Sequence, residues 1–391
     1  MSASQVEAPL IYLIAGEPSG DALGANLMRA LRRRTDGAVR FAGIGGEQMA
    51  GEGLTSLVPI DDLAIMGVAE VLPRARRILK RVAEAVADIR AKKPAAVVTI
   101  DSSGFNWRVA QRLRGLGETL PLIHYVAPMV WAWRGSRARR MARWYDHLMA
   151  LLPNEPPYFT AAGLSCSYVG HPVVEMGADK GDGKEFRRRH GIAPDARVIA
   201  VLPGSRRGEV GRLLPILEAA ARLLARRYPS LVAVLPATEN VADRVAVAVA
   251  AWPLRSIVLR GKGEKYDAFA ASDVALAASG TVAVELALAK VPSVITYRVS
   301  RLTHALVRGI VRVKFAHLLN LLLDRAAVPE LIQQDCTPEN LAAAVAGLLD
   351  DPTARSAQIS ACQEALKALG YGGLSPGLRA ADEILARIGR R

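Results

Sequence analysis

A loop in the second half of the sequence carries residue types that suit a phosphate ligand. In VIAVLPGSRRGEV an apolar run ends at Gly204 and Ser205, and Arg206 follows directly. Backbone N–H groups at the start of a following helix, together with an arginine side chain, bind pyrophosphate groups well. We therefore expect Gly204, Ser205 and Arg206 to contact an anionic ligand.

A second loop of the same half is more informative. In DVALAASGTVAVELALAK, the residues Ser279, Gly280 and Thr281 open a helix, and Glu285 follows one turn later on the same face. An anion at the helix start and a carboxylate that accepts hydrogen bonds from ribose hydroxyls would together hold a nucleoside diphosphate. Alternatively, the SGT segment only caps the helix and Glu285 is a solvated acid. The sequence contains no GxxxxGK[ST] motif and no GxGxxG motif after its first strand.

The first half offers a candidate general base. Asp101 ends the apolar run VVTI and precedes DSSGFN. In a parallel sheet the carboxyl ends of the strands border the ligand site, where a catalytic base has to lie. The alternative is that Asp101 caps the next helix.

A basic amphipathic segment spans residues 66–89. Pro73 suits a helix start, and apolar residues follow at helical spacing. Such a helix either covers a sheet or lies on anionic lipid. The residues expected to contact lipid are Met66, Val68, Val71, Leu72, Arg74, Arg76, Arg77 and Lys80. A second basic stretch, residues 124–146, joins Trp131 and Trp133 to several arginines and could bind an anionic head group or nucleic acid.

The elements that must position these residues follow from short apolar runs that end at glycine, proline or polar residues. Expected strands are residues 10–16, 39–46, 94–102, 120–128 and 145–153, then 196–205, 231–238, 256–261, 273–280 and 291–299. Helical stretches lie between them, and from about residue 338 onward the pattern is helical. The alternation predicts parallel sheets covered on both faces, and residues 175–184 lapse into Gly, Asp and Lys as at a hinge.

Composition narrows the function classes. A chain of 391 residues favours more than one domain. The 51 Lys and Arg against 37 Asp and Glu give a net charge of +14, which indicates an anionic partner or merely a basic surface. The 3 cysteines form no metal-binding pattern and fit a reducing compartment, and no apolar run is long enough to span a membrane. We expect a cytoplasmic protein.

Seven motifs, in this order and spacing, resemble the lipid-A-disaccharide synthase family. They are GEPSGD (16–21), IDSSGFN (100–106), HYVAPMVWAWR (124–134), VGHPVVE (169–175), LPGSRRGEV (202–210), SGTVAVELAL (279–288) and LLNLLLDRAAVPELIQQDCTPENLA (318–342). The resemblance implies a GT-B fold: two Rossmann-like domains face each other across a cleft, and a C-terminal helix returns to the first domain. The implied domains are residues 1–174 on the acceptor and membrane side, 185–350 for the UDP-sugar, and a helical tail, 351–391, that packs on the first domain.

The resemblance also implies a reaction. An inverting transfer without metal or other cofactor would move 2,3-diacylglucosamine from UDP-2,3-diacylglucosamine to 2,3-diacylglucosamine 1-phosphate, lipid X. The products would be the β-1,6-linked lipid A disaccharide 1-phosphate and UDP. Because both sugars carry acyl chains, the enzyme would be peripheral on the cytoplasmic face of the inner membrane of a Gram-negative bacterium. No nucleic acid partner is expected, and a homodimer stays open.

Site roles follow from the same resemblance. Asp101 would take the proton of the acceptor 6-hydroxyl, Glu285 would hold the ribose, and Asn320 and Arg325 are further candidates for the donor. In the GEPSGD loop, the glycines would leave room for the acceptor sugar and the incoming helix. Glu17, Ser19, Gly20 and Asp21 would form the acceptor side, with helix capping as the alternative for Ser19 and Asp21.

The chain departs from the family pattern at DSSGFN, where the usual motif is DAPDFN, so Gly104 replaces a second aspartate. Two other functions are open at this point. A UDP-N-acetylglucosamine 2-epimerase would share the fold and a ribose-holding glutamate, but it needs no lipid surface. A non-catalytic basic protein would bind membrane or nucleic acid without binding UDP.

Overall fold

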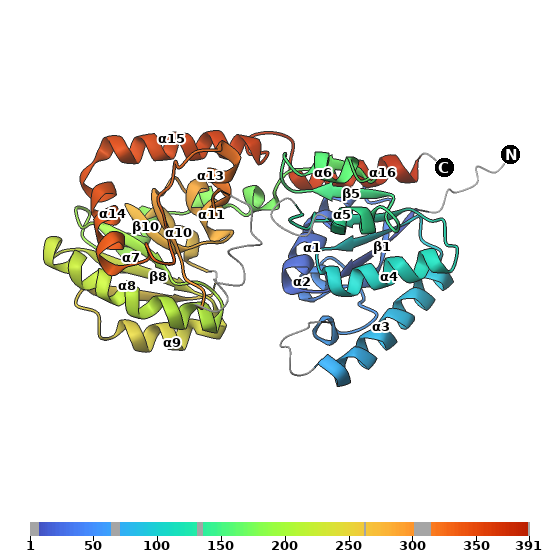
Figure 1. Cartoon of the computed structure of the whole chain (residues 1–391), viewed down its shortest axis with the longest axis horizontal. Coiled ribbons are helices and arrows are strands. Elements are labelled where there is room, and N and C mark those ends of the chain that lie inside the picture. Colours follow the sequence, from blue (N-terminus) through green and yellow to red (C-terminus); the bar gives the residue numbers. More distant parts are fainter. Residues whose placement is uncertain (1–7, 64–70, 131–135, 262, 301–313, 390–391) are drawn as a thin grey trace. The chain divides into compact units, whose positions relative to one another are not determined.

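The computed structural model describes residues 8–63, 71–130, 136–261, 263–300 and 314–389; the side chains of residues 71–75 and of Ser103 lie outside the description. The chain forms two compact units (Figure 1). Unit 1 is Met1–Pro172 with Gly372–Arg391, and unit 2 is Val173–Tyr371.

A parallel six-stranded sheet forms the centre of unit 1, in the order β2-β1-β3-β4-β5-β6. Its strands are β1 Leu10–Ala15, β2 Arg40–Ile44, β3 Ala96–Ile100, β4 Leu122–Tyr125, β5 His147–Ala150 and β6 Ser165–Tyr168. The inner strands are apolar on both faces, with every residue of β3, β4 and β5 buried, as expected for a parallel sheet between helical layers.

Helices cover both faces of this sheet. They are α1 Pro18–Arg34, α2 Glu47–Gly51, α3 Val71–Lys92, α4 Ser103–Gly115, α5 Ser136–Met141, α6 Pro156–Thr160 and α16 Pro376–Ile388, with the 3-10 turn η1 Ile60–Asp62. A further 3-10 turn, η3 Pro172–Glu175, lies where unit 1 passes into unit 2. One core cluster joins the sheet to α3, α4, α5 and α6. The other joins it to α1, α2 and the C-terminal α16.

Unit 2 repeats the plan with a parallel sheet in the order β12-β11-β10-β7-β8-β9. Its strands are β7 Val198–Leu202, β8 Val232–Ala237, β9 Arg255–Arg260, β10 Val274–Ala278, β11 Ser293–Tyr297 and β12 Glu330–Ile332. Its helices are α7 Gly183–Arg189, α8 Arg207–Arg227, α9 Glu239–Val249, α10 Lys265–Ala270, α11 Val282–Leu288, α13 Leu318–Leu323, α14 Pro338–Asp350 and α15 Pro352–Ala368, with the 3-10 turn η4 Ala178–Lys180. One apolar cluster of described residues packs α8, α9 and α14 on this sheet.

Each sheet has one point where the strand order reverses, and ligands of open α/β sheets bind at such points. In unit 1 the chain leaves β1 for β2 on one side, whereas β3 pairs with β1 on the other. In unit 2 it leaves β7 for β8 on one side, whereas β10 pairs with β7 on the other. The loops after β1, β3, β7 and β10 are those singled out from the sequence.

The end of the chain differs from the expected tail. Residues 351–391 do not pack on unit 1 as one segment, because α15 contacts α11, α13 and α14 within unit 2. Only α16 packs on α1 in unit 1, through Ala380, Ala381 and Ile384. Helix α16 packs on unit 1, apart from α15, because it carries a continuous apolar face that completes the unit 1 core.

Candidate functional site

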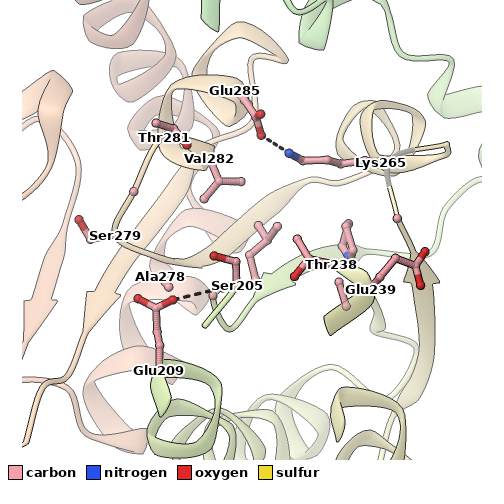
Figure 2. Close-up of a pocket in the computed structure, with 16 residues that line it drawn as sticks. Ser205, Glu209, Thr238, Glu239, Lys265, Ala278, Ser279, Thr281, Val282 and Glu285 are labelled. Atoms are coloured by element: carbon pink, nitrogen blue, oxygen red, sulfur yellow. Dashed lines mark hydrogen bonds and ion pairs between the residues drawn. The ribbon is translucent and has the colours of Figure 1, made fainter. Parts of the chain in front are cut away.

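A pocket of about 460 Å³ opens where β7 and β10 end (Figure 2). It is formed by the loops after β7, β8 and β10 and by the first turns of α10 and α11. Its lining residues are Leu202, Gly204, Ser205, Glu209, Pro236, Ala237, Thr238, Glu239, Gly261, Lys265, Ala278, Ser279, Gly280, Thr281, Val282 and Glu285. Six residues expected to bind the donor therefore lie together: Gly204, Ser205, Ser279, Gly280, Thr281 and Glu285.

The loop after β7 requires a glycine. Gly204 has a φ of +106°, and a Cβ added there would lie 2.1 Å from an oxygen of Glu209. That carboxylate is buried and accepts a hydrogen bond of 3.2 Å from the backbone N–H of Ser205. Glu209 thus fixes the shape of the loop, a role that its position in LPGSRRGEV did not reveal.

The loop after β10 presents small polar residues to the pocket. The Ser279 hydroxyl donates to the carbonyl oxygen of Ala316 at 3.3 Å. A Cβ added to Gly280 would meet no atom within 4 Å, so this glycine borders open space. Thr281 is the N-cap of α11 and makes no side-chain cap bond. Ser279, Gly280 and Thr281 therefore line the pocket, with the Ser279 hydroxyl bonded to Ala316.

Glu285 is 6% exposed and points across the pocket to Lys265, the first residue of α10 (Figure 2). Their ammonium and carboxylate groups form an ion pair. Burial, and then the neighbouring Glu285 carboxylate, raise the pKa of Tyr266 to about 12. Lys265 was not among the expected site residues, because it stands in GKGEKYDAF, which has no motif character. Thr238 and Glu239, after β8, were missed for the same reason.

Asp101 follows the last residue of β3 in an unusual backbone. Asp101 and Ser102 both have positive φ, +50° and +37°. The buried Asn106 amide donates to the carbonyl oxygens of Ile100 and Asp101, at 2.9 Å each. Two neighbouring left-handed residues other than glycine store strain, which is often found at functional sites. The Asp101 side chain accepts a hydrogen bond of 3.3 Å from the Ser19 hydroxyl.

The GEPSGD loop therefore contacts Asp101 through Ser19, whereas Gly20 and Asp21 stabilise the packing of unit 1. Glu17 and Ser19 are exposed at the start of α1. Asp21 is buried, and its carboxylate accepts hydrogen bonds from the backbone N–H groups of Gly46, Gln48 and Met49. Gly20 is packed against the carbonyl oxygen of Ile100, where an added Cβ would lie at 3.3 Å. Asp21 thus acts as a helix cap, the alternative considered for it, although the helix that it caps is α2. Gly20 lets α1 approach β3, and contact of either residue with the acceptor stays a prediction.

Two donor candidates lie outside the pocket. The Asn320 amide is fully buried and already bonded, to Val328 and Glu330 through its nitrogen and to the backbone N–H groups of residues 327 and 328 through its oxygen. Arg325 forms an exposed ion pair with Glu364. Asn320 thus holds the segment before β12, and Arg325, which follows α13, pairs with α15. A donor role for either residue stays a prediction that this pocket does not support. Arg206 is exposed at the N-cap of α8, beside Ser205 but outside the pocket lining.

The basic segment is helix α3. Ile78 and Val82 are buried, whereas Arg76, Arg77 and Lys80 are exposed and Leu79 is 58% exposed. Arg77 and Lys80 form long ion pairs with Asp62 and Glu84, at 3.8 and 3.9 Å. Met66 and Val68 lie outside the described residues, as do Trp131 and Trp133, and the side chains of Val71, Leu72 and Arg74 are not described.

Among the residues that the structure describes, no group of three or more His, Cys, Asp or Glu is arranged to hold a metal ion. No helix in this described part combines the length and apolar character needed to cross a membrane.

Comparisons with known proteins agree with this geometry. The family model described as Lipid-A-disaccharide synthetase matches residues 11–372. A Lipid-A-disaccharide synthase of Rhodospirillum centenum is 57% identical over 382 residues, which cover 98% of this chain and 95% of that protein.

Solved structures share the fold at low identity. The glycotransferase of kitacinnamycin has a TM-score of 0.62 and 16% identity, over 97% of this chain and 99% of that one. A UDP-GlcNAc 2-epimerase from Neisseria meningitidis, bound to UDP-GlcNAc, has a TM-score of 0.60 and 12% identity, over 98% and 99% of the two chains. With its two parallel six-stranded sheets the chain has the GT-B fold. The fold alone does not separate a transferase from an epimerase, but the sequence match does.

Proposed function

This chain belongs to the lipid-A-disaccharide synthase family, and from that premise we propose how its residues divide the work of the reaction. The protein is a glycosyltransferase of lipid A biosynthesis that forms the lipid A disaccharide. Its substrates in this proposal are UDP-2,3-diacylglucosamine and lipid X. The observation that carries the assignment of sites is the unit 2 pocket, which gathers the residues suited to a nucleoside diphosphate.

The unit 2 pocket would hold the UDP part of the donor. Glu285 would accept hydrogen bonds from the ribose hydroxyls. The Thr281 hydroxyl and the backbone of Gly280 would bind the β-phosphate, while Ser279 would line the phosphate site with its hydroxyl on Ala316. Arg206 beside Ser205 would add a cation. These donors would stabilise the charge that builds on the β-phosphate as UDP leaves.

Unit 1 would act on the acceptor. Asp101 would accept the proton of the acceptor 6-hydroxyl while that oxygen attacks the anomeric carbon of the donor sugar. The new glycosidic bond forms as the bond to UDP breaks, so the anomeric configuration inverts. Ser19 would orient the Asp101 carboxylate through its hydrogen bond, and the exposed Glu17 would contact acceptor hydroxyls.

Helix α3 would bring the enzyme to its lipid substrates. Arg76, Arg77 and Lys80 are exposed beside the 58% exposed Leu79. Basic side chains next to an apolar one bind anionic membrane surfaces at about 1 kcal/mol per Lys or Arg. The proposed location is therefore the cytoplasmic face of the inner membrane, with peripheral attachment.

The reaction is tested by incubating purified protein with UDP-2,3-diacylglucosamine and lipid X in detergent and detecting the disaccharide phosphate by mass spectrometry. Asp101→Ala should lower turnover by about 10²–10⁴-fold with UDP affinity near normal. Asp61→Ala, which removes an exposed carboxylate of unit 1, is the matched control. Near wild-type turnover in Asp101→Ala would remove Asp101 from the base role. Release of UDP without disaccharide would instead favour epimerase-like chemistry.

Lipid contact is tested with vesicles that contain phosphatidylglycerol. The triple variant Arg76→Glu, Arg77→Glu, Lys80→Glu should bind them on the order of 100-fold more weakly and keep its UDP affinity. The control reverses three exposed arginines of α8 instead, Arg222, Arg226 and Arg227. Equal losses in both triple variants would mean that only net charge matters, and α3 would lose its proposed role.

A further inference from the structure

The unit 2 pocket has an uneven charge. Among its described lining residues, the carboxylates are Glu209, Glu239 and Glu285, and the single cation is Lys265. A nucleoside diphosphate is itself an anion, so acids in its pocket have to be occupied or neutralised. The Glu209 carboxylate accepts a hydrogen bond from the backbone N–H of Ser205. Lys265 is committed to Glu285.

Glu285 is largely buried beside this partner. Its side chain is 8% exposed, and that of Lys265 is 22% exposed. A carboxylate with so little access to water is unfavourable unless a cation or several hydrogen-bond donors face it. A carboxylate also has about four acceptor positions, so a lysine on one oxygen leaves positions for further donors.

Lys265 is held in place from two sides. Its ammonium lies 5.5 Å from the centroid of the Tyr266 ring and 5.6 Å from that of Phe269, within the range of cation–π attraction. Its helix is anchored as well, because the Asp267 carboxylate accepts a hydrogen bond of 2.8 Å from the backbone N–H of Asp182. A side chain fixed in this way can fix the group that it contacts.

We propose that Lys265 is a positioning residue: its ammonium holds the Glu285 carboxylate in the orientation that accepts the ribose hydroxyls of the nucleotide. The inference rests on the proposed donor site. It explains why that site would select a nucleotide with ribose hydroxyls. Lys265 acts through Glu285 and leaves the phosphates to the loops after β7 and β10. Loss of Lys265 therefore weakens recognition of the sugar hydroxyls more than recognition of the diphosphate.

The test compares the dissociation constants of UDP and 2′,3′-dideoxyuridine diphosphate by calorimetry. Hydrogen bonds to a charged group make the wild-type protein prefer UDP by about tenfold or more. In Glu285→Gln the preference falls to about threefold or less. Lys265→Met lowers the preference for UDP to the same extent, and Lys265→Arg restores most of it. In the double variant Lys265→Met, Glu285→Gln, the preference is the same as in Glu285→Gln alone. Lys265→Gln serves if the Met variant does not fold, and Lys184→Met, on the exposed face of α7, is the matched control.

The outcomes separate the inference from its premise. If Lys265→Met keeps the wild-type preference, or weakens both nucleotides equally, the positioning role is overturned while the pocket stays the UDP site. If the wild-type protein binds neither nucleotide, the proposed donor site itself fails and the inference fails with it. A preference that disappears in Lys265→Met but survives in Glu285→Gln would show that Lys265 does not act through Glu285.

Discussion

Asp101 and Asn106 illustrate how single residues shape the proposed acceptor site. The strained backbone of Asp101 and Ser102 has to be held by other groups, and the buried Asn106 amide supplies two hydrogen bonds to the carbonyl oxygens on either side of the bend. The Asp101 carboxylate is aimed by that backbone. Asn106 is thus a positioning residue for the proposed base, although it touches no reacting atom itself.

Replacement of Asn106 tests this coupling. Asn106→Ala leaves two carbonyl oxygens without their donor and should cost about 1–3 kcal/mol of unfolding free energy. The bend at Asp101 should also relax, so kcat should fall while UDP affinity stays unchanged. Chemical denaturation and steady-state kinetics measure the two effects. Stability loss with an unchanged kcat would show that the bend does not depend on Asn106.

Residue types predicted the site only in part. Gly204, Ser205, Ser279 and Thr281 were found because phosphate loops have a recognisable composition at strand ends. Lys265 was not found, because its partner Glu285 is 20 residues away and only the fold brings them together. For Asp21 and Asn320 the sequence left the role open for a physical reason. A buried polar side chain that bonds to the backbone has the same residue type as one that bonds to a ligand.

At the scale of elements, Asp21 joins two helices. It lies in the first turn of α1, yet its carboxylate caps α2 through three backbone N–H groups, so the two helices and the loop after β2 are fixed together. The packing is close as well, since a Cβ added to Gly24 of α1 would lie 2.4 Å from the Met49 sulfur. The GEPSGD motif is therefore partly a packing motif, and within it Ser19 is the residue that bonds to the proposed base Asp101.

Asp21→Ala should behave as a structural variant. The loss of a buried carboxylate from three N–H groups should lower the unfolding free energy by about 2–3 kcal/mol. Asp351→Ala is the matched control, because Asp351 caps α15 from an exposed position and should cost only about 1 kcal/mol. Urea titrations give both values. An unchanged stability together with a raised KM for the acceptor would return Asp21 to the acceptor side.

Strands were predictable to the extent that they are buried. The expected runs around residues 94–102 and 273–280 contain β3 and β10, whose residues are all buried. β6 and β12 were missed, and each is a short strand at the edge of its sheet without a fully buried residue. An edge strand buries less apolar surface, so its sequence carries little of the pattern on which such predictions depend.

At the scale of the whole molecule, unit 1 is built from both ends of the chain. Helix α16 completes its core and adds polar contacts: Asp382 pairs with Arg34, and Arg387 contacts the buried His147. The stability of unit 1 therefore depends on residues that follow all of unit 2 in the sequence. In the part of the chain that the structure describes, the two units also differ in how many histidines have a pKa lowered by burial, so we expect different responses to acid.

Among the described residues, burial lowers the pKa of His124 to about 3 and those of His147, His171 and His317 to about 4. These side chains are neutral in the folded protein, whereas an unfolded histidine takes up a proton near pH 6.5. Between about pH 6.5 and 4 the unfolded chain therefore binds more protons, and stability falls as the pH falls. At pH 5 the loss is about 2 kcal/mol for each such histidine.

His124, His147 and His171 belong to unit 1 and His317 to unit 2, so unit 1 should lose more stability between pH 7 and pH 5. Hydrogen exchange in urea, followed in peptides that contain β1 and β7, reports each unit separately. The β1 peptide should lose protection at a lower urea concentration at pH 5 than at pH 7, with a smaller change for β7. His147→Gln removes one of the titrating groups, and its unit 1 should therefore be less sensitive to acid than that of the wild-type protein. If the two peptides were equally sensitive to acid, the prediction would be contradicted. The neutral histidines of unit 1 would then not control how its stability responds to pH.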